Sequence, residues 1–360
     1  MSRRRSVPEA AAAFGKEGAN VSARARALYK RALVFDANLE PPFANWPYPA
    51  EAAAIVRESG VNCAKLSLGG TNSPYDNVVA EVAWVQRFIE ASPDVFMQIR
   101  DARDFARAKK EKRYGILFSF ESTDMLEGKP ERIELFRNLG VRVMQLCYNK
   151  TSPFGAGVLA DPALPLTEDG KKAIETMTQV GVALDLSHAG PTTMTDAIAA
   201  STKPVLLTHT GCSAIHQHPR NKTDEQLKAV ADKGGVVGIY VLPYLTPSPK
   251  QPNLDDYMAH MFHALNVCGE DHVGIGSDSL MSRFDTSPEA IADFNKETER
   301  RKATGVAAPE EDRPLYVEGL NHPRRCETIT DAFLKRGYSE RVAEKVLGLN
   351  FVNALTEIWK

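Results

Sequence analysis

A small set of imidazole and carboxylate side chains stands directly after short apolar runs of the sequence. The chain of 360 residues has 8 histidines, and both His188 and His209 follow such a run. Glu121 follows an earlier run, and Asp278 follows the last one. Two imidazoles and a carboxylate that converge on one edge of a sheet are a usual way to hold zinc. A single loop histidine is more often bonded to a backbone carbonyl, so the metal prediction depends on the whole set.

Two further side chains have chemistry that fits a metal site. Asp278 can accept a proton from an attacking water, although aspartate is also a favoured helix N-cap. Arg220 lies in the loop after His209, close to His216 and His218. Its guanidinium matches a carboxylate bidentately, but the residues alone are equally compatible with an ordinary surface arginine. Two histidines at i and i+2 in an irregular loop are weak support for a metal.

The elements that position these residues alternate between apolar strands and helices. Eight β-branched, apolar runs are expected as strands buried on both faces. They span residues 32–36, 63–68, 114–120, 141–147, 182–186, 205–208, 235–240 and 272–277. Helices are expected between them, including 167–179 and 223–233, and the second opens with a capping-box pattern. This order predicts an α/β fold, a single (β/α)8 barrel of the TIM type, with a doubly wound open sheet as the alternative.

A barrel places the candidate residues together, because its active sites lie at the carboxyl ends of the strands. After the eighth strand, residues 283–325 are charged and proline-rich without a clear period, which predicts a long loop over the barrel mouth. Extra C-terminal helices are expected at 327–335, 339–347 and 351–359. We therefore expect one domain at 30–360, preceded by an N-terminal extension at 1–29.

Composition limits the partners and the compartment. The net charge of −2 and the pI near 6.5 do not indicate a nucleic-acid-binding protein. No apolar run approaches the length of a membrane span. Five cysteines without a CxxC pair predict buried free thiols and favour a cytoplasmic location. Arginines at positions 3–5 are reminiscent of an export signal, but no apolar segment follows them, so an exported form would require a longer precursor.

Ordered motifs resemble the membrane (renal) dipeptidase family from about residue 30 to 358. They are DLSH at 185–188, PVLLTH at 204–209, HPRNKTD at 218–224, GIGSD at 274–278, RGYS at 336–339 and GLNF at 348–351. The resemblance implies a zinc-dependent barrel hydrolase in which metal-activated water cleaves the amide bond of a small dipeptide-like substrate. It also implies two zinc ions bridged by a glutamate.

The resemblance implies roles for individual residues. Glu121 is similar to the bridging glutamate, and His188 and His209 are similar to the ligands of one zinc ion. Arg220 resembles the residue that binds the substrate carboxylate. Asp278 resembles the catalytic aspartate beside the bridging water. Asn149, which follows the fourth expected strand, is also expected to contact the substrate.

Three positions depart from the family pattern. The histidine and aspartate ligands of the other zinc fall on Asn38 and Glu40. A neutral amide is a poor zinc ligand, so Asn38 is a doubtful ligand and Glu40 a weak one. One zinc site is therefore expected to be firm and the second doubtful. A family histidine that polarises the scissile carbonyl falls on Tyr148, whose phenol can donate a hydrogen bond instead and is expected to be catalytic and to bind substrate.

Three functions are compatible with these residues. The first is a zinc dipeptidase. The second is a related barrel amidohydrolase that acts on another small amide or lactam, or serves a biosynthetic pathway, because fold and metal do not determine the substrate. The third is a catalytically weak binding or structural homologue. An enzyme would take a small peptide or amide as its partner, and the sequence leaves the oligomeric state open, a homodimer included.

Overall fold

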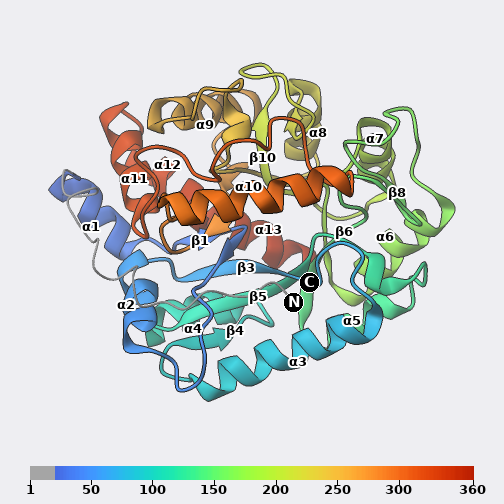
Figure 1. The fold of residues 1–360 in the computed structure, drawn as a ribbon, viewed down its shortest axis with the longest axis horizontal. Helices are drawn as coiled ribbons and strands as arrows, with labels where there is room; N and C mark the ends of the chain where they lie inside the picture. Colours follow the sequence, from blue (N-terminus) through green and yellow to red (C-terminus); the bar gives the residue numbers. More distant parts are fainter. Residues whose placement is uncertain (1–20) are drawn as a thin grey trace.

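A ring of parallel strands surrounded by helices forms the centre of the chain (Figure 1). The computed structural model describes residues 21–360. Neighbouring strands are parallel and follow the order β1, β3, β5, β6, β9, β10, β12 and β13. Their bounds are Phe35–Asp36, Cys63–Leu68, Tyr114–Phe120, Val141–Gln145, Ala183–Asp185, Leu206–Cys212, Val236–Ile239 and Val273–Ile275. Each overlaps one of the eight expected runs, and β10 continues beyond its expected end at 208 so that His209 lies within the strand.

Backbone hydrogen bonds join the first strand to the last. Ala37 N donates to Ile275 O at 2.9 Å, and Asp278 N donates to Asn38 O at 2.7 Å. Just beyond, β2 (Leu39–Glu40) pairs in parallel with β14 (Ser279–Leu280). The predicted barrel is therefore confirmed, and the doubly wound alternative is wrong. The sequence prediction missed two short strands, β4 (Phe96–Gln98) beside the start of β5 and β11 (Asn221–Lys222) beside the end of β10.

The barrel interior is apolar at its amino end and polar toward its carboxyl end. The apolar layer includes Phe35, Cys63, Leu117, Val143, Ala183, Leu206 and Val236. Helix α13 (Asn350–Ile358) closes this end with Phe351, and a Cβ at Gly274 would lie 2.5 Å from the Phe351 ring. Residues two positions further along the strands are buried and polar, namely Lys65, Ser119, Gln145, Asp185 and Thr208. Because strand side chains alternate, this polar layer lies directly beneath the carboxyl rim.

Helices form the outer ring. They are α2 (Ala50–Ser59), α3 (Tyr75–Ala91), α4 (Arg103–Glu111), α5 (Arg132–Asn138), α6 (Glu168–Val180), α7 (Pro191–Ala200), α8 (Asp224–Asp232), α9 (Leu254–Cys268), α11 (Arg325–Lys335) and α12 (Glu340–Glu344). Helix α8 begins with the expected capping box, and Thr167 caps α6 by accepting a hydrogen bond from Gly170 N. The helices expected in the C-terminal tail are confirmed as α11, α12 and α13. Preceding the barrel, α1 (Ala23–Arg31) packs against α11.

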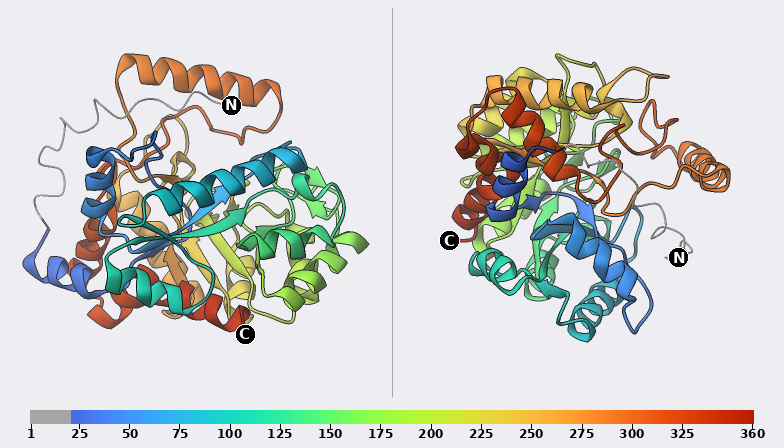
Figure 2. Two further views of the ribbon diagram at one scale, coloured as in Figure 1. Left: turned by 90° about the horizontal axis from the view of Figure 1, so that it is seen from below. Right: turned by 90° about the vertical axis from the view of Figure 1, so that its left-hand side faces the viewer.

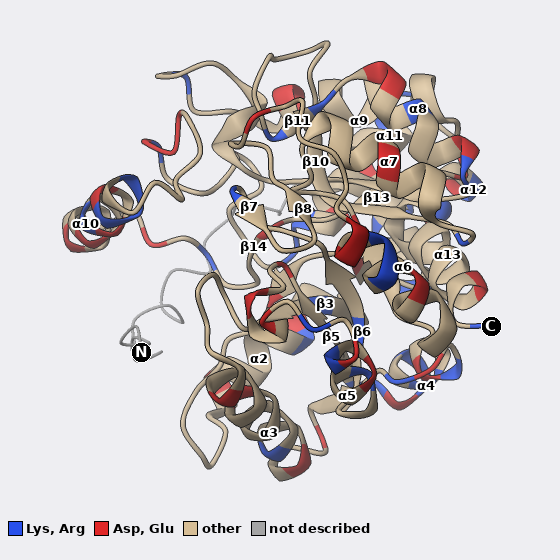
Figure 3. Cartoon of the chain, turned by 90° about the vertical axis from the view of Figure 1, so that its right-hand side faces the viewer, with Lys and Arg blue, Asp and Glu red and all other residues tan. Residues whose placement is uncertain are grey.

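The region 283–325 contains a helix that the sequence prediction treated as part of a loop. Helix α10 (Pro288–Ala303) follows the N-cap Ser287 and has Thr298 as its single buried residue. A helix that is polar on nearly all sides shows no apolar period, which explains why the pattern did not predict it. Figure 2 shows α10 standing away from the barrel, and Figure 3 shows acidic and basic residues along it.

Two compositional expectations can be compared with the described residues. All five cysteines are buried and free, as expected. Across residues 21–360, no helix has both the length and the apolar character needed to cross a membrane. The arginines at positions 3–5 lie outside the described residues.

Candidate metal centre

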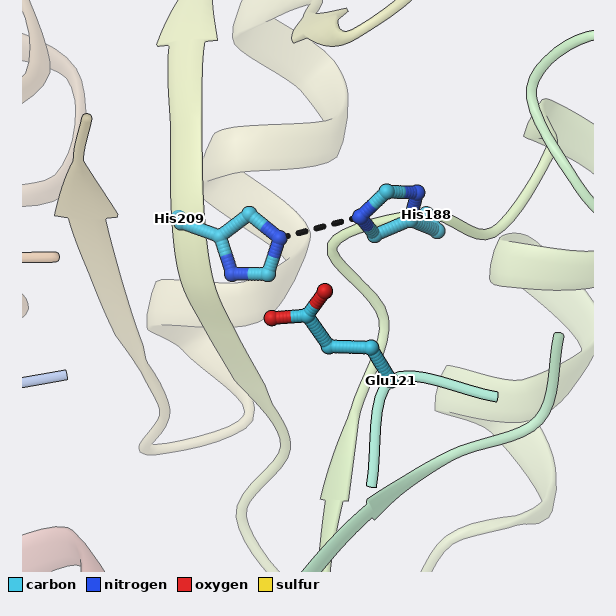
Figure 4. A group of neighbouring side chains, drawn as sticks. All are labelled: Glu121, His188 and His209. Carbon is cyan, nitrogen blue, oxygen red and sulfur yellow. Dashed lines mark hydrogen bonds between the residues drawn. The ribbon is translucent and has the colours of Figure 1, made fainter. Parts of the chain in front are cut away.

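Glu121, His188 and His209 meet at the carboxyl rim of the barrel (Figure 4). Glu121 directly follows β5, His188 follows β9, and His209 lies within β10. One potential ligand atom from each lies within 4.8 Å of the others, and the two Nε2 atoms are 3.0 Å apart. Two nitrogens at ~2.0–2.1 Å from one tetrahedral zinc ion would be about 3.3 Å apart. The geometry therefore matches two ligands of a single ion.

The side-chain amide of Asn149 fixes the proton of His188, because its own orientation is set by a second hydrogen bond. His188 Nδ1 lies 2.8 Å from Asn149 Oδ1, and Asn149 Nδ2 donates to Val306 O at 2.9 Å. The amide nitrogen is thus committed to a carbonyl, and the amide oxygen must accept from His188. Nδ1 of His188 therefore carries the proton, and Nε2 presents a lone pair to the centre.

A second chain of hydrogen bonds has the same effect on His209. The hydroxyl of Thr208 donates to Asp185 Oδ2 at 2.5 Å and lies 2.8 Å from His209 Nδ1. Because its hydrogen is committed to the carboxylate, the hydroxyl oxygen accepts from His209 Nδ1. His209 therefore also presents the lone pair of Nε2.

The 3.0 Å contact between the two Nε2 atoms, dashed in Figure 4, is a hydrogen bond only if one of them carries a proton. With both protons on Nδ1, two lone pairs face each other and repel, and a cation between them would remove this repulsion. Burial lowers the pKa of His188, and the nearby charge of Arg220 lowers it further. Burial also lowers the pKa of His209, although Asp278 and Glu121 oppose the shift. Neutral imidazole is the form that binds metal. The residues present therefore fit a metal ion.

The Glu121 carboxylate is surrounded by donors. Its Oε1 accepts from Asn38 Nδ2 at 2.7 Å and lies 3.5 Å from Lys65 Nζ. Burial raises the pKa of Glu121, but the nearby charge of Lys65, the hydrogen bond from Asn38 and the charge of Arg220 act against it, and the net direction is downward. The carboxylate is therefore in its anionic, metal-binding form.

Asp278 faces Glu121 across the amide of Asn38. Asn38 Nδ2 donates to Asp278 Oδ1 at 2.7 Å as well as to Glu121. Burial and the neighbouring Glu121 carboxylate raise the pKa of Asp278, while the charges of Arg220 and Lys65 oppose them. Its backbone has φ of 51°, a left-handed conformation that is uncommon for a residue other than glycine and often found at functional sites.

Arg220 is buried with part of its guanidinium unsatisfied. The residue is 3% exposed, and no described residue accepts a hydrogen bond from its Nε or Nη2. Buried donors are normally satisfied, and a guanidinium edge with two free N–H groups matches one carboxylate. The side chain is therefore suited to an anionic ligand.

The sequence matches the profile of the membrane dipeptidase family, peptidase family M19, over residues 22–302. The chain belongs to this family. An amidohydrolase from Pseudomonas aeruginosa of known structure is 28% identical with a TM-score of 0.81, and the match covers 93% of this chain and 99% of that one.

Two sequence relatives differ in how much of their length is matched. A dipeptidase of Claviceps purpurea is 25% identical over 281 residues, which are 77% of this chain and 59% of that protein. This chain thus spans about three fifths of that relative. An uncharacterized protein from the pqqA 5′ region of Klebsiella pneumoniae is 27% identical over 299 residues, covering 80% of this chain and 98% of that protein.

Two of the three predicted departures from the membrane dipeptidase pattern, Asn38 and Glu40, line one pocket. Asn38 and Glu40 line a cavity of about 400 Å³ together with Glu121 and Asp278. Glu40 does not belong to the group of three potential ligands found among the described residues. Asn38 presents its nitrogen, a donor, to both carboxylates. A wall of the pocket comes from the 283–325 region and includes Phe284, Leu315, Tyr316, Leu320 and Asn321.

Tyr148 and Asn149 take different positions at this rim. The Tyr148 ring stacks on His188 with the ring centroids 4.1 Å apart. Burial raises the pKa of Tyr148, while Arg301 of α10 opposes this shift, and the phenol stays protonated at neutral pH. The Asn149 side chain lies behind His188 with both ends engaged. Its expected contact with substrate stays a prediction.

Three buried residues near the centre, Asp185, Thr208 and Lys65, have contacts that their positions in the sequence did not indicate. Asp185 and Thr208 lie inside the motifs already recognised, so their positions were visible but their hydrogen bonds were not. Lys65 was visible as a lysine within an apolar strand. A charge at such a position indicates a buried partner, and that partner is Glu121.

Proposed function

We propose that this protein is a zinc-dependent dipeptidase that hydrolyses the amide bond of a small dipeptide-like substrate. Membership of the membrane dipeptidase family supports hydrolysis of this kind. The observation that carries the proposal is the pair of facing Nε2 lone pairs of His188 and His209 beside the carboxylate of Glu121. A buried anion-binding guanidinium at Arg220 supports a substrate with a free carboxylate.

Glu121, His188 and His209 would hold the zinc ion and leave a fourth position open, as catalytic zinc sites do. A zinc ion bound there supplies Lewis acidity to the scissile carbonyl and lowers the pKa of the attacking water. Imidazole and carboxylate ligands in this number favour zinc over the hard cations, which prefer oxygen ligands alone.

The chain's own residues provide binding and proton transfer. Arg220 binds the substrate carboxylate and orients the peptide. Tyr148 donates a hydrogen bond to the carbonyl oxygen as negative charge develops on it. Asp278 accepts the proton released by the attacking water and delivers it to the nitrogen of the leaving amine. One amide bond is cleaved, and one water molecule is consumed.

We further propose one firmly bound ion and a second that is weak or absent. The nitrogen of Asn38 lies against Glu121 and Asp278, where a family histidine would direct a lone pair toward a second ion. Glu40 carries a carboxylate but lies outside the ligand group.

A substrate panel with metal removal and restoration tests this proposal. Dipeptides, C-terminally amidated dipeptides, N-acyl amino acids and a lactam should be offered to the purified protein before and after chelation. We expect hydrolysis of free dipeptides, loss on chelation and recovery with stoichiometric zinc. Because Asn38 departs from the family pattern, hydrolysis of the lactam or acyl amino acids alone would favour the related amidohydrolase instead. A zinc-loaded protein that cleaves nothing in the panel would contradict the proposed activity.

A further inference from the structure

Lys65 places a buried positive charge beside the proposed zinc ligand. The residue lies in β3, is 1% exposed and points into the barrel. Its Nζ donates to Ser119 Oγ at 3.2 Å and lies 3.5 Å from Glu121 Oε1. An ammonium group in such a place must be compensated, and Glu121 is the nearby carboxylate that compensates it.

The same carboxylate oxygen is also held by Asn38. Asn38 Nδ2 donates to Glu121 Oε1 and to Asp278 Oδ1, at 2.7 Å in each case. A neutral amide and an ammonium therefore converge on one oxygen of Glu121. Asp278, another acid that lines this pocket, accepts a hydrogen bond from the same amide nitrogen.

A second divalent ion bound to Glu121 on the side of Asn38 and Asp278 would be close to Lys65. An ion bound to Glu121 Oε1 lies ~2.0–2.2 Å from that oxygen, which places it within about 6 Å of the ammonium. Like charges at this separation repel strongly in a buried site. The amide nitrogen of Asn38 already donates hydrogen bonds to the carboxylates of Glu121 and Asp278. Glu40 and Asp278 also line this pocket, but the Glu121 oxygen that a second ion would share is already next to an ammonium group and accepts from an amide donor.

We infer that Lys65, together with Asn38, takes the place of the second metal ion. The ammonium group of Lys65 then neutralises Glu121 Oε1, and the centre holds a single ion. This inference rests on the proposed zinc site. It predicts that restoring the family ligands at Asn38 and Glu40 is not sufficient for tight binding of two ions while Lys65 is present.

Zinc stoichiometry of matched variants tests the inference. The parent, the double variant Asn38→His/Glu40→Asp, and triple variants that add Lys65→Met or Lys65→Arg should be loaded with zinc, dialysed and analysed by mass spectrometry of the metal. We expect one ion in the parent, one in the double variant, two in the Lys65→Met triple variant and one in the Lys65→Arg triple variant. Second-site affinity should rise roughly 10–100-fold when the ammonium is removed.

Two tightly bound ions in the double variant would overturn the role of Lys65, as would a single ion in the Lys65→Met triple variant. Circular dichroism and thermal unfolding establish that each variant is folded. Should Lys65→Met fail to fold, Lys65→Gln replaces it in the triple variant, with the same expected result. A parent that binds no zinc contradicts the proposed metal site, whereas a parent that tightly binds two ions contradicts the Lys65 inference and leaves dipeptidase activity standing.

Discussion

The side-chain amide of Asn149 donates a hydrogen bond of 2.9 Å to the backbone carbonyl of Val306. This contact connects the segment that follows α10 to the candidate metal centre, because the oxygen of the same amide lies 2.8 Å from His188 Nδ1. A residue in the region that crosses the barrel mouth therefore fixes the amide that orients a proposed ligand.

Replacing Asn149 by alanine should weaken zinc binding by roughly 10–100-fold, because His188 loses the acceptor that fixes its tautomer. Competition with a chelator of known affinity measures the effect. Asn149→Asp is the matched control, since a carboxylate keeps the acceptor for His188 while losing the donor to Val306. If the alanine variant bound zinc as tightly as the parent, Asn149 would not orient His188.

Thr208→Val should have a similar effect at His209. Valine has nearly the same shape but accepts no hydrogen bond, so Nδ1 of His209 loses its partner and the connection to Asp185 is broken. We expect zinc affinity to fall by about 10–100-fold, with Thr208→Ser close to the parent because it keeps the hydroxyl. Chelator competition on both variants checks this, and equal affinities of the valine and serine variants would refute the proposed connection.

Arg220→Lys should raise KM for free dipeptides more than it changes kcat. A point charge replaces a planar group whose Nε and Nη2 have no acceptor among the described residues. In the parent, amidated dipeptides should be poor substrates for the same reason. Steady-state kinetics on paired free and amidated peptides measures both effects. Equal kcat/KM for the two forms would show that Arg220 does not bind the substrate carboxylate.

Tyr148→Phe should lower kcat by about 10²–10³-fold, the usual cost of removing one donor to a developing oxyanion. Phenylalanine can keep the stacking on His188, so zinc content is expected to stay at the parent level. Metal analysis together with single-turnover rates shows whether the hydroxyl acts in the chemical step or supports the metal ligand. An unchanged kcat would remove Tyr148 from the chemistry, and a loss of zinc would show that the hydroxyl supports the ligand instead.

The sequence predicted the parts of this protein that depend on burial. Strands inside a barrel are apolar in almost every position, so all eight were visible, and the carboxyl rim then grouped Glu121 with His188 and His209. Helix α10 escaped prediction because it contacts the body along so little of its surface that it needs no apolar stripe.

The surroundings of the metal centre could not be predicted in the same way. The contact between Lys65 and Glu121 and that between Asn149 and Val306 join residues far apart in the sequence. Their alignment follows from barrel register and from the path of a loop, and neither leaves a periodic signal. Asn149 shows the consequence: its place after a strand indicated the rim, but not that its side chain lies behind His188.

Anomalous diffraction from zinc-loaded crystals, recorded on both sides of the zinc absorption edge, tests the proposed centre most directly. We expect one strong peak between His188 Nε2 and His209 Nε2, at ~2.0–2.1 Å from both nitrogens and within ~2.2 Å of a Glu121 oxygen. The side near Asn38 and Lys65 should show no peak of comparable height. A peak elsewhere on the chain, with the two imidazoles still in direct contact as they are at 3.0 Å, would contradict the assignment of these three residues as the metal ligands.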